Sequence, residues 1–208
     1  MPVVVSGVVE LKKALKQYAP DLKKQLDDEV RVALKEVVKA ARDKVPGSAP
    51  GGLYNWQDDG REAKSRISGR AAFPKYNSMI IRRGLTYSLG TSKMNSKGFQ
   101  ALYSLLNKSR TGAIVETAGR KNPFGDPKSR SNNPQAGRRF NAAMNGVGSL
   151  KQYDKFERGR GRLLYAAYAE NQGRALNAVM KAIDKAERLF NQRSRTHNEK
   201  VSVYGISA

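Results

Sequence analysis

The sequence predicts an α+β fold in which long N-terminal and C-terminal helices pack on a small, mostly antiparallel sheet, with long basic loops between them. Three observations favour it. Apolar residues recur at helical spacing near both ends of the 208-residue chain, short β-type runs lie between them, and Gly- and Pro-rich stretches separate the segments. The length fits one compact domain, so a single domain is expected over residues 1–208.

Two helices are predicted in the first 45 residues. The first begins after Gly7 and ends before Pro20, which cannot continue it. The second begins at Pro20, where a proline in the first turn and the acidic Asp21 near the positive end of the helix dipole are both favourable, and it stops at Pro46. Its apolar side chains form one stripe: Leu22, Leu26, Val30, Ala33, Leu34, Val37, Ala41 and Val45.

The sheet is expected from four short apolar runs in the middle of the chain. The first two are separated by Arg83-Gly84, which can form a tight turn. The four predicted strands are Ser78–Arg82, Leu85–Gly90, Tyr103–Leu106 and Ala113–Glu116.

Two long segments lack sustained periodicity. Residues 46–77 are predicted to be an extended loop, and residues 120–161 a basic loop insertion. Loops of this length are unusual in a self-contained domain, so each is either mobile alone or ordered by a partner.

The end of the chain predicts a last long helix and a terminal strand. The helix begins at Leu163, and Gly173 weakens or bends it. Residues 200–208 alternate apolar and polar groups, as an edge strand or arm would. The apolar stripe of the helix is Leu163, Leu164, Ala167, Tyr168, Leu176, Val179, Met180, Ile183, Ala186 and Phe190.

The charge is strongly positive and uneven. The chain has 39 Lys and Arg against 18 Asp and Glu, a net charge of +21, and residues 46–162 carry +15 of it. Such a charge favours polyanions or acidic protein surfaces as partners. Aromatic residues are 8% of the chain and are not interleaved with the basic residues along the sequence, so incidental contact with DNA, or acidic neighbours, fits better than sequence readout.

Sequence motifs for catalysis or metal binding are weak. We therefore expect that the protein is not an enzyme and binds no metal and no cofactor. Cysteine is absent, and the one histidine, His197, is expected to be exposed beyond the last helix. Asp27 and Asp28 are adjacent on a helix and so do not face each other. The loop pair Asp58 and Asp59 is the remaining candidate for a nuclease-like cation site, which keeps an enzyme as the third alternative.

No apolar block of signal-peptide type and no apolar run of membrane-spanning length is present. We therefore expect a protein that acts in the cytoplasm or in something assembled there.

Candidate contact residues lie in the basic middle and at the C-terminus. Glu116 is the one acidic residue between Arg66 and Arg120, and it forms either a local pair or an intersubunit salt bridge. The segment Arg158–Arg162 resembles a fragment of an RNA-binding arginine-glycine segment, or serves as a flexible lead-in to the last helix. The candidate partner contacts are Glu116, Arg120, Lys121, Arg138, Arg139, Val201, Val203, Tyr204 and Ile206, and the candidate DNA-facing residues are Arg158, Arg160 and Arg162, with Lys128 left unassigned.

The order of several motifs resembles the tail-completion, or neck, family of long-tailed bacteriophages with non-contractile tails. The motifs are GVVELKKAL at residues 7–15, ARDKVP at 41–46, GAIVETAGRKNP at 112–123 and GRLLYAA at 161–167. The resemblance implies an α+β fold and a hexameric ring at the head–tail junction of the virion. It also implies contacts with connector, tail-terminator or tail-tube proteins around the DNA channel, and no catalytic residues.

The chain departs from the family pattern in its 46–75 loop and its 120–160 insertion. The alternative function is a basic nucleic-acid-binding accessory protein, such as a packaging or chromosome-associated factor. Such a protein would bind DNA with steep salt dependence through residues 120–160.

Overall fold

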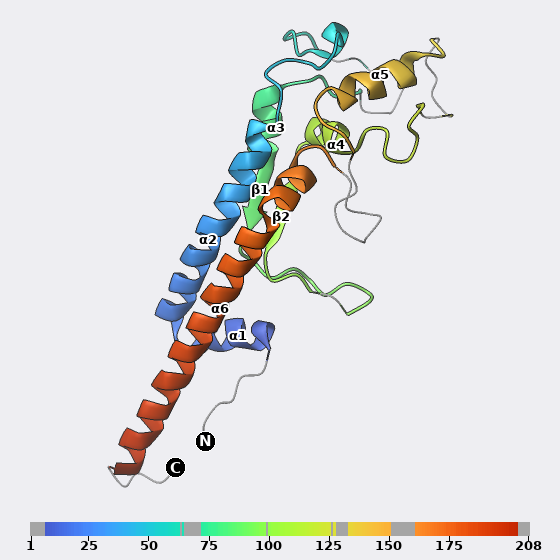
Figure 1. The fold of residues 1–208 in the computed structure, drawn as a ribbon. Helices are drawn as coiled ribbons and strands as arrows, with labels where there is room; N and C mark the ends of the chain where they lie inside the picture. Colours follow the sequence, from blue (N-terminus) through green and yellow to red (C-terminus); the bar gives the residue numbers. More distant parts are fainter. Residues whose placement is uncertain are drawn as a thin grey trace. The chain divides into compact units, whose positions relative to one another are not determined.

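The computed structural model describes residues 7–62, 64, 72–98, 100–125, 127, 133–150 and 161–203, the last seven by their backbone alone, and they form a helix-rich α+β fold (Figure 1). Its sheet is a pair of antiparallel strands, β1 and β2. In chain order the elements are α1 Val8–Tyr18, α2 Pro20–Asp43, the 3-10 helix η1 Tyr54–Trp56, α3 Ser78–Gly84, β1 Leu85–Ser88, β2 Ser104–Asn107, α4 Arg110–Thr117, α5 Ala136–Asn145 and α6 Leu164–Val203.

The two predicted N-terminal helices are confirmed. Gly7, with φ of 98°, precedes α1, and Pro20 opens α2. Every residue of the predicted stripe of α2 is buried, from Leu22 to Val45. Burying an aliphatic side chain of this size contributes about 1.5–3 kcal/mol, so this stripe is a main source of stability.

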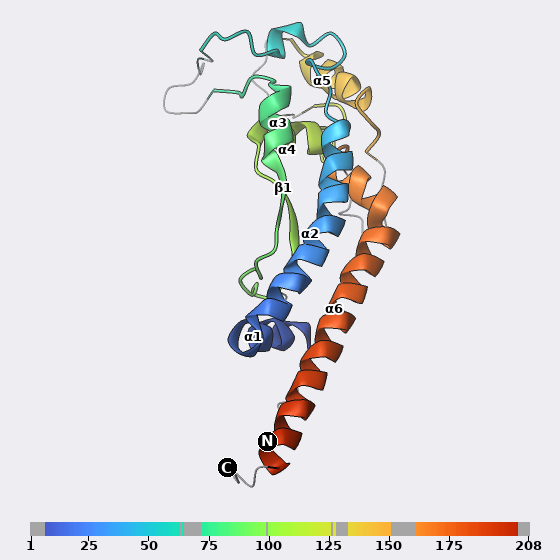
Figure 2. The ribbon, with the colours of Figure 1, turned by 90° about the vertical axis from the view of Figure 1, so that its left-hand side faces the viewer.

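The residues divide into two compact units. Unit 1 comprises Met1–Glu36, Ser88–Ser104 and Gln172–Ala208, and unit 2 comprises Val37–Tyr87 and Leu105–Asn171. In unit 1, α2 and α6 lie side by side in both ribbon views (Figures 1 and 2). Apolar side chains of both helices are buried there: Leu22, Leu26 and Val30 of α2, and Ala182, Ala186 and Phe190 of α6.

Unit 2 has its own core. The second half of α2 contributes Val37 and Ala41, and the Arg42 guanidinium of the same helix donates to the Leu85 carbonyl at 2.8 Å. The other fully buried large side chains of this unit include Tyr76, Ile81, Leu85, Val115, Met144, Arg162 and Leu163.

Two of the four predicted strands are wrong. Ser78–Arg82 lies in helix α3, whose cap residue Asn77 accepts hydrogen bonds from the backbone N–H groups of Met79 and Ile80, both at 3.1 Å. An asparagine that satisfies two free N–H groups favours a helix start over a strand. The other two predicted strands are close to β1 and β2, which confirms their type.

Ala113–Glu116 is likewise helical and lies in α4. Ser109 caps this helix by accepting from the N–H of Gly112 at 3.0 Å. Short apolar runs fit a strand and a buried helical turn equally well, so the cap decides between them.

The predicted loops contain more structure than expected. The described part of 46–77 holds η1 and a parallel bridge between Gln57 and Tyr76, and the predicted insertion 120–161 holds α5. The buried face of α5 consists of Asn141, Ala143 and Met144. These side chains secure α5 to the rest of unit 2.

The last helix is longer than predicted, and the predicted stripe is confirmed only in part, since Leu163, Ala167, Ile183, Ala186 and Phe190 are buried. It includes residues 201–203, so the predicted terminal strand is wrong there, and His197 lies within α6. The inward positions are mostly alanines, and their small side chains allow close packing: Ala166, Ala167, Ala175, Ala182 and Ala186. The predicted stripe residues Tyr168, Leu176 and Met180 are exposed.

Candidate partner-binding surface

Glu116 lies in the interior of unit 2 and caps the first turn of α6. Its carboxylate accepts backbone N–H groups from Leu163 at 3.2 Å, Leu164 at 2.8 Å and Tyr165 at 3.1 Å. The first N–H groups of a helix have no partner within it, and the helix dipole favours a negative charge at this end. Burial raises the pKa of the Glu116 carboxyl, while the three N–H donors and the nearby Arg162 charge oppose that rise.

Arg162 is buried beside Glu116 and joins three segments of unit 2. It is 1% exposed, and its guanidinium donates to the carbonyl oxygens of Ala118 at 2.7 Å and Gly148 at 2.9 Å. It also donates to Oδ1 of Asn145, the last residue of α5, at 2.7 Å. A planar group with five N–H donors can satisfy such a set of acceptors, which an ammonium cannot match in geometry.

These positions correct two of the sequence predictions. Arg162 is not a DNA-facing residue, because its charge and its donors are used inside the fold. Glu116 forms neither a local pair with Arg120 or Lys121 nor an exposed contact for a partner, because it is 4% exposed and its oxygens accept from the start of α6. Nothing in the sequence near Glu116 signals this role, since its partners lie about 48 residues further along the chain.

The other predicted contact residues have varied positions. Arg138 and Arg139 are exposed on α5, Lys121 is exposed, and Arg120 is half-buried. Val201 and Val203 lie in the backbone of α6. Lys128, Arg158, Arg160, Tyr204 and Ile206 fall outside the described residues.

Four aromatic rings that are far apart in the sequence meet in unit 2. Trp56 lies at the centre, with ring centroids 5.1 Å from Tyr76, 5.1 Å from Phe140 and 6.0 Å from Phe73. Trp56 is 7% exposed and its indole N–H donates to the Pro74 carbonyl at 2.7 Å. This cluster fixes the segment around Phe73 against α5.

Two close backbone approaches seat α5 in this position. A Cβ on Gly51 would lie 2.9 Å from the Cα and Cβ of Ala143, and a Cβ on Gly137 would lie 2.6 Å from the Cα of Gly125. Glycine is therefore required for the segments to pass this closely. Phe140 of α5 is thereby held against Trp56 (Figure 2 shows α5).

The segments that form the cluster also carry exposed rings and cations. Phe73 is 59% exposed and Tyr54 is 81% exposed, whereas Lys75 donates from its ammonium to the Asn55 carbonyl at 3.1 Å. Over its whole sequence, unit 2 holds 23 basic and 9 acidic residues, a net charge of +14. We refer to the following residues as the aromatic–basic surface: Tyr54, Phe73, Lys75, Arg138, Arg139 and Phe140.

The carboxylates near this surface are used locally. Asp58 accepts from Asn77 Nδ2 at 3.0 Å, and this hydrogen bond is the main cause that lowers its pKa. Asp59 accepts from the Arg61 N–H at 3.1 Å and pairs with the Arg61 guanidinium. Among the described residues, no group of three or more His, Cys, Asp or Glu side chains could hold a metal ion.

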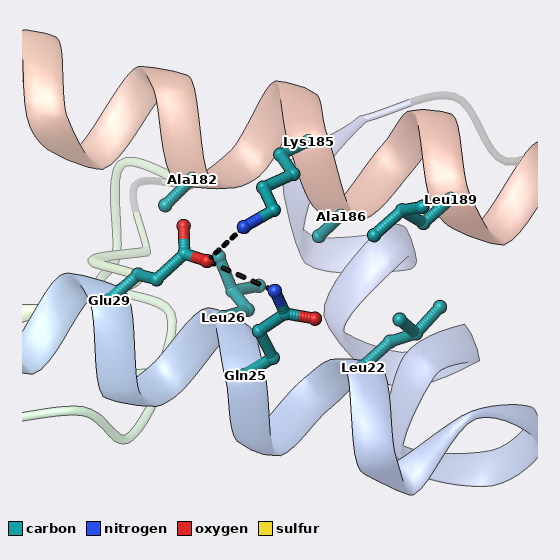
Figure 3. A pocket seen from close by; sticks show the side chains of 8 residues that line it. All are labelled: Leu22, Gln25, Leu26, Glu29, Ala182, Lys185, Ala186 and Leu189. Atoms are coloured by element: carbon teal, nitrogen blue, oxygen red, sulfur yellow. Dashed lines mark hydrogen bonds and ion pairs between the residues drawn. The ribbon is translucent and has the colours of Figure 1, made fainter.

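Unit 1 has a buried lysine and a small crevice. The Lys12 ammonium donates to the carbonyls of Leu89 at 2.8 Å and Leu102 at 3.2 Å and lies 4.1 Å from the centre of the Tyr103 ring, and burial lowers its pKa. The crevice lies between α2 and α6, where Lys185 binds Glu29 at 2.6 Å (Figure 3). Both features lie between segments of unit 1.

Within the described part of the chain, no helix is both long and apolar enough to cross a membrane. Comparison with protein families, curated proteins and solved structures finds no match to this chain.

Proposed function

We propose that this protein is a structural component of the head–tail connector, or neck, of a long-tailed bacteriophage. Copies of the chain form a ring, expected to be a hexamer, that joins the head connector to the tail terminator or tail tube around the DNA channel. The protein is assembled in the host cytoplasm, acts in the virion and carries out no chemical reaction.

One observation carries this proposal: two of the motifs behind the family resemblance make direct contact. Glu116 belongs to the motif at 112–123, and Arg162 and Leu164 belong to the motif at 161–167. Glu116 accepts the Leu164 N–H at 2.8 Å, and Arg162 donates to Ala118 at 2.7 Å. The two motifs therefore form one structural unit in this chain, as expected if both belong to a common fold, and this supports the proposal.

The distribution of charge also supports an assembly role. Unit 2 carries a net charge of +14 and exposes Arg138 and Arg139 on α5. So large a charge of one sign opposes contact between two copies of the same surface and favours a partner of opposite sign. A protein placed between acidic neighbours or beside DNA meets this condition.

The oligomeric state of the purified protein tests the proposal. Light scattering after gel filtration, with negative-stain micrographs of the same fraction, is expected to show a closed ring. A variant that lacks residues 201–208 should form fewer rings, because the terminal segment is proposed to reach a neighbouring subunit. Leu176→Ala, an exposed position in unit 1, is the matched control and should leave the rings unchanged. A monomer at every concentration, together with absence of the protein from purified particles, would overturn the proposal.

A further inference from the structure

The aromatic–basic surface combines two chemical properties at one place. Phe73 exposes 59% of its surface although Trp56 and Phe140 hold its ring, with centroids 6.0 and 6.2 Å away. A ring that is held on one side and open on the other loses little conformational entropy when a flat group stacks on it. Tyr54 adds a second exposed ring two residues before Trp56.

Cations lie in the two segments that contribute Phe73 and Phe140 to the cluster. Lys75 is two residues from Phe73 and lies against η1 through its bond to Asn55, and Arg138 and Arg139 directly precede Phe140 in α5. Two acidic residues of this region, Asp58 and Asp59, are bound to local donors. The net charge of +14 on unit 2 selects a polyanion.

The combination of exposed rings and cations indicates which kind of polyanion fits this surface: an acidic protein, duplex DNA or single-stranded nucleic acid. The core of a protein interface is depleted of charged residues, whereas the segments that carry these rings also carry Lys75, Arg138 and Arg139. Duplex DNA keeps its bases stacked on one another, so it offers phosphates but no free base to an exposed phenylalanine. Single-stranded nucleic acid offers both, and proteins bind it with aromatic rings and a positively charged groove.

We propose that the aromatic–basic surface binds single-stranded nucleic acid, with bases stacked on Phe73 and Tyr54 and phosphates bound by Lys75, Arg138 and Arg139. The fold creates this site, because Phe73 and Phe140 lie 67 residues apart in the sequence and their ring centroids come to 6.2 Å of each other beside Trp56. The inference does not depend on the proposed neck function, and either can fail without the other.

The test uses the full-length protein and a fluorescently labelled 20-nucleotide oligothymidine, with binding followed by anisotropy. Trp56 is the one tryptophan of the chain and touches the proposed stacking ring, so its emission reports occupancy at this place. We expect saturable binding that changes Trp56 emission and weakens as salt rises, with a slope of about 0.7 per phosphate contact.

Two kinds of variant separate stacking from charge. Phe73→Leu retains apolar packing but removes the ring, and it should weaken oligothymidine binding about 10-fold with the salt slope unchanged, while binding to a 20-base-pair duplex stays the same. The double variant Arg138→Gln, Arg139→Gln should weaken binding to both and reduce the salt slope. Leu176→Ala, an exposed apolar residue of unit 1, is the control and should bind as the parent does.

Three outcomes would overturn the proposal. One is the absence of saturable binding to oligothymidine, and another is an unchanged affinity in Phe73→Leu with its thermal unfolding intact. The third is binding of a 20-residue polyglutamate with the same affinity and the same sensitivity to Phe73→Leu, which would identify an acidic protein segment as the occupant.

Discussion

The carboxylate of Glu116 in α4 accepts the backbone N–H of Leu164, at the first turn of α6, at 2.8 Å. The side chain that caps the longest helix therefore comes from a segment 48 residues earlier. This cap satisfies helix N–H groups that would otherwise be unpaired within the interior of unit 2. It makes the start of α6 dependent on α4, and this dependence can be measured.

Replacement of Glu116 should destabilise the protein strongly. Glu116→Ala leaves three N–H donors unpaired and the buried Arg162 charge without its neighbour, so the free energy of unfolding should fall by about 3 kcal/mol. Glu116→Gln keeps one acceptor oxygen, so its free energy of unfolding should fall by less than that of Glu116→Ala. Urea denaturation measures both. The control is Glu170→Ala, which removes an exposed pair with Lys44 and should cost under about 1 kcal/mol. A loss in Glu116→Ala no greater than in the control would contradict the capping role.

The geometry of Arg162 should matter as much as its charge. Arg162→Lys keeps the charge but cannot reach the acceptors on Ala118, Gly148 and Asn145 together, so we expect a loss of about 2 kcal/mol in unfolding free energy. Arg138→Lys makes the same exchange at an exposed position of α5 and should lie within about 0.5 kcal/mol of the parent. Equal effects of the two substitutions would show that the donor geometry of Arg162 is unimportant.

One substitution should have opposite effects at two helical glycines. Gly137→Ala places a methyl group 2.6 Å from the Cα of Gly125, so α5 must shift, at a cost of about 1–3 kcal/mol. Gly173→Ala in α6 meets no atom within 4 Å and should stabilise the protein by about 0.5–1 kcal/mol through its higher helix propensity. Thermal unfolding of the two variants tests both signs, and stabilisation by Gly137→Ala would refute the close approach.

Two tyrosines should ionise late in an alkaline titration. Burial raises the pKa of Tyr76 and of Tyr103 to about 12, from 10.0 for a solvated phenol. The unfolded chain loses these protons near pH 10 and the folded chain keeps them, so stability falls as pH rises from 10 towards 12, by about 1.4 kcal/mol per pH unit for each group. Phenolate absorbance of the folded protein, which has nine tyrosines, should therefore show a delayed component.

Phenylalanine variants assign that component. Tyr103→Phe should remove part of the delayed absorbance component and change the free energy of unfolding little. Within the described chain, the buried hydroxyl of Tyr103 has no hydrogen-bond partner to lose. Tyr76→Phe should also remove part of the delayed component. It loses the hydrogen bond from the Tyr76 hydroxyl to the Pro46 carbonyl, at 2.5 Å, so the free energy of unfolding should fall by about 1 kcal/mol. Ionisation of all nine tyrosines near pH 10 in the folded state would contradict the burial of these two.

The parts of the fold that the sequence predicts well are those with long, local periodicity. The stripe of α2 runs over about seven turns, and each of its residues is buried. The runs at 78–82 and 113–116 are too short for periodicity to decide, although Asn77 and Ser109 carried the helix-cap signal. On α6 the bulky residues predicted the buried face only in part: Ile183 and Phe190 are buried, but Tyr168, Leu176 and Met180 are exposed. Most of the inward positions of this helix are alanines, which the bulky residues do not indicate.

The candidate site could not be predicted in this way. Trp56, Phe73, Tyr76 and Phe140 lack any common sequence spacing, and the cluster forms only because Gly51 and Gly137 let α5 approach closely. The capping of α6 by Glu116 is also a long-range contact. By contrast, the basic character of Arg138 and Arg139 was evident from composition, and both are exposed.

The proposed place of this protein in a virion is tested most directly by a cryo-electron microscopy reconstruction of the phage particle to which the proposal assigns it. The proposal predicts ring density at the head–tail junction into which the paired helices α2 and α6 of unit 1 fit, with the same copy number as the purified ring. A neck reconstructed at side-chain resolution and fully accounted for by other proteins would contradict it.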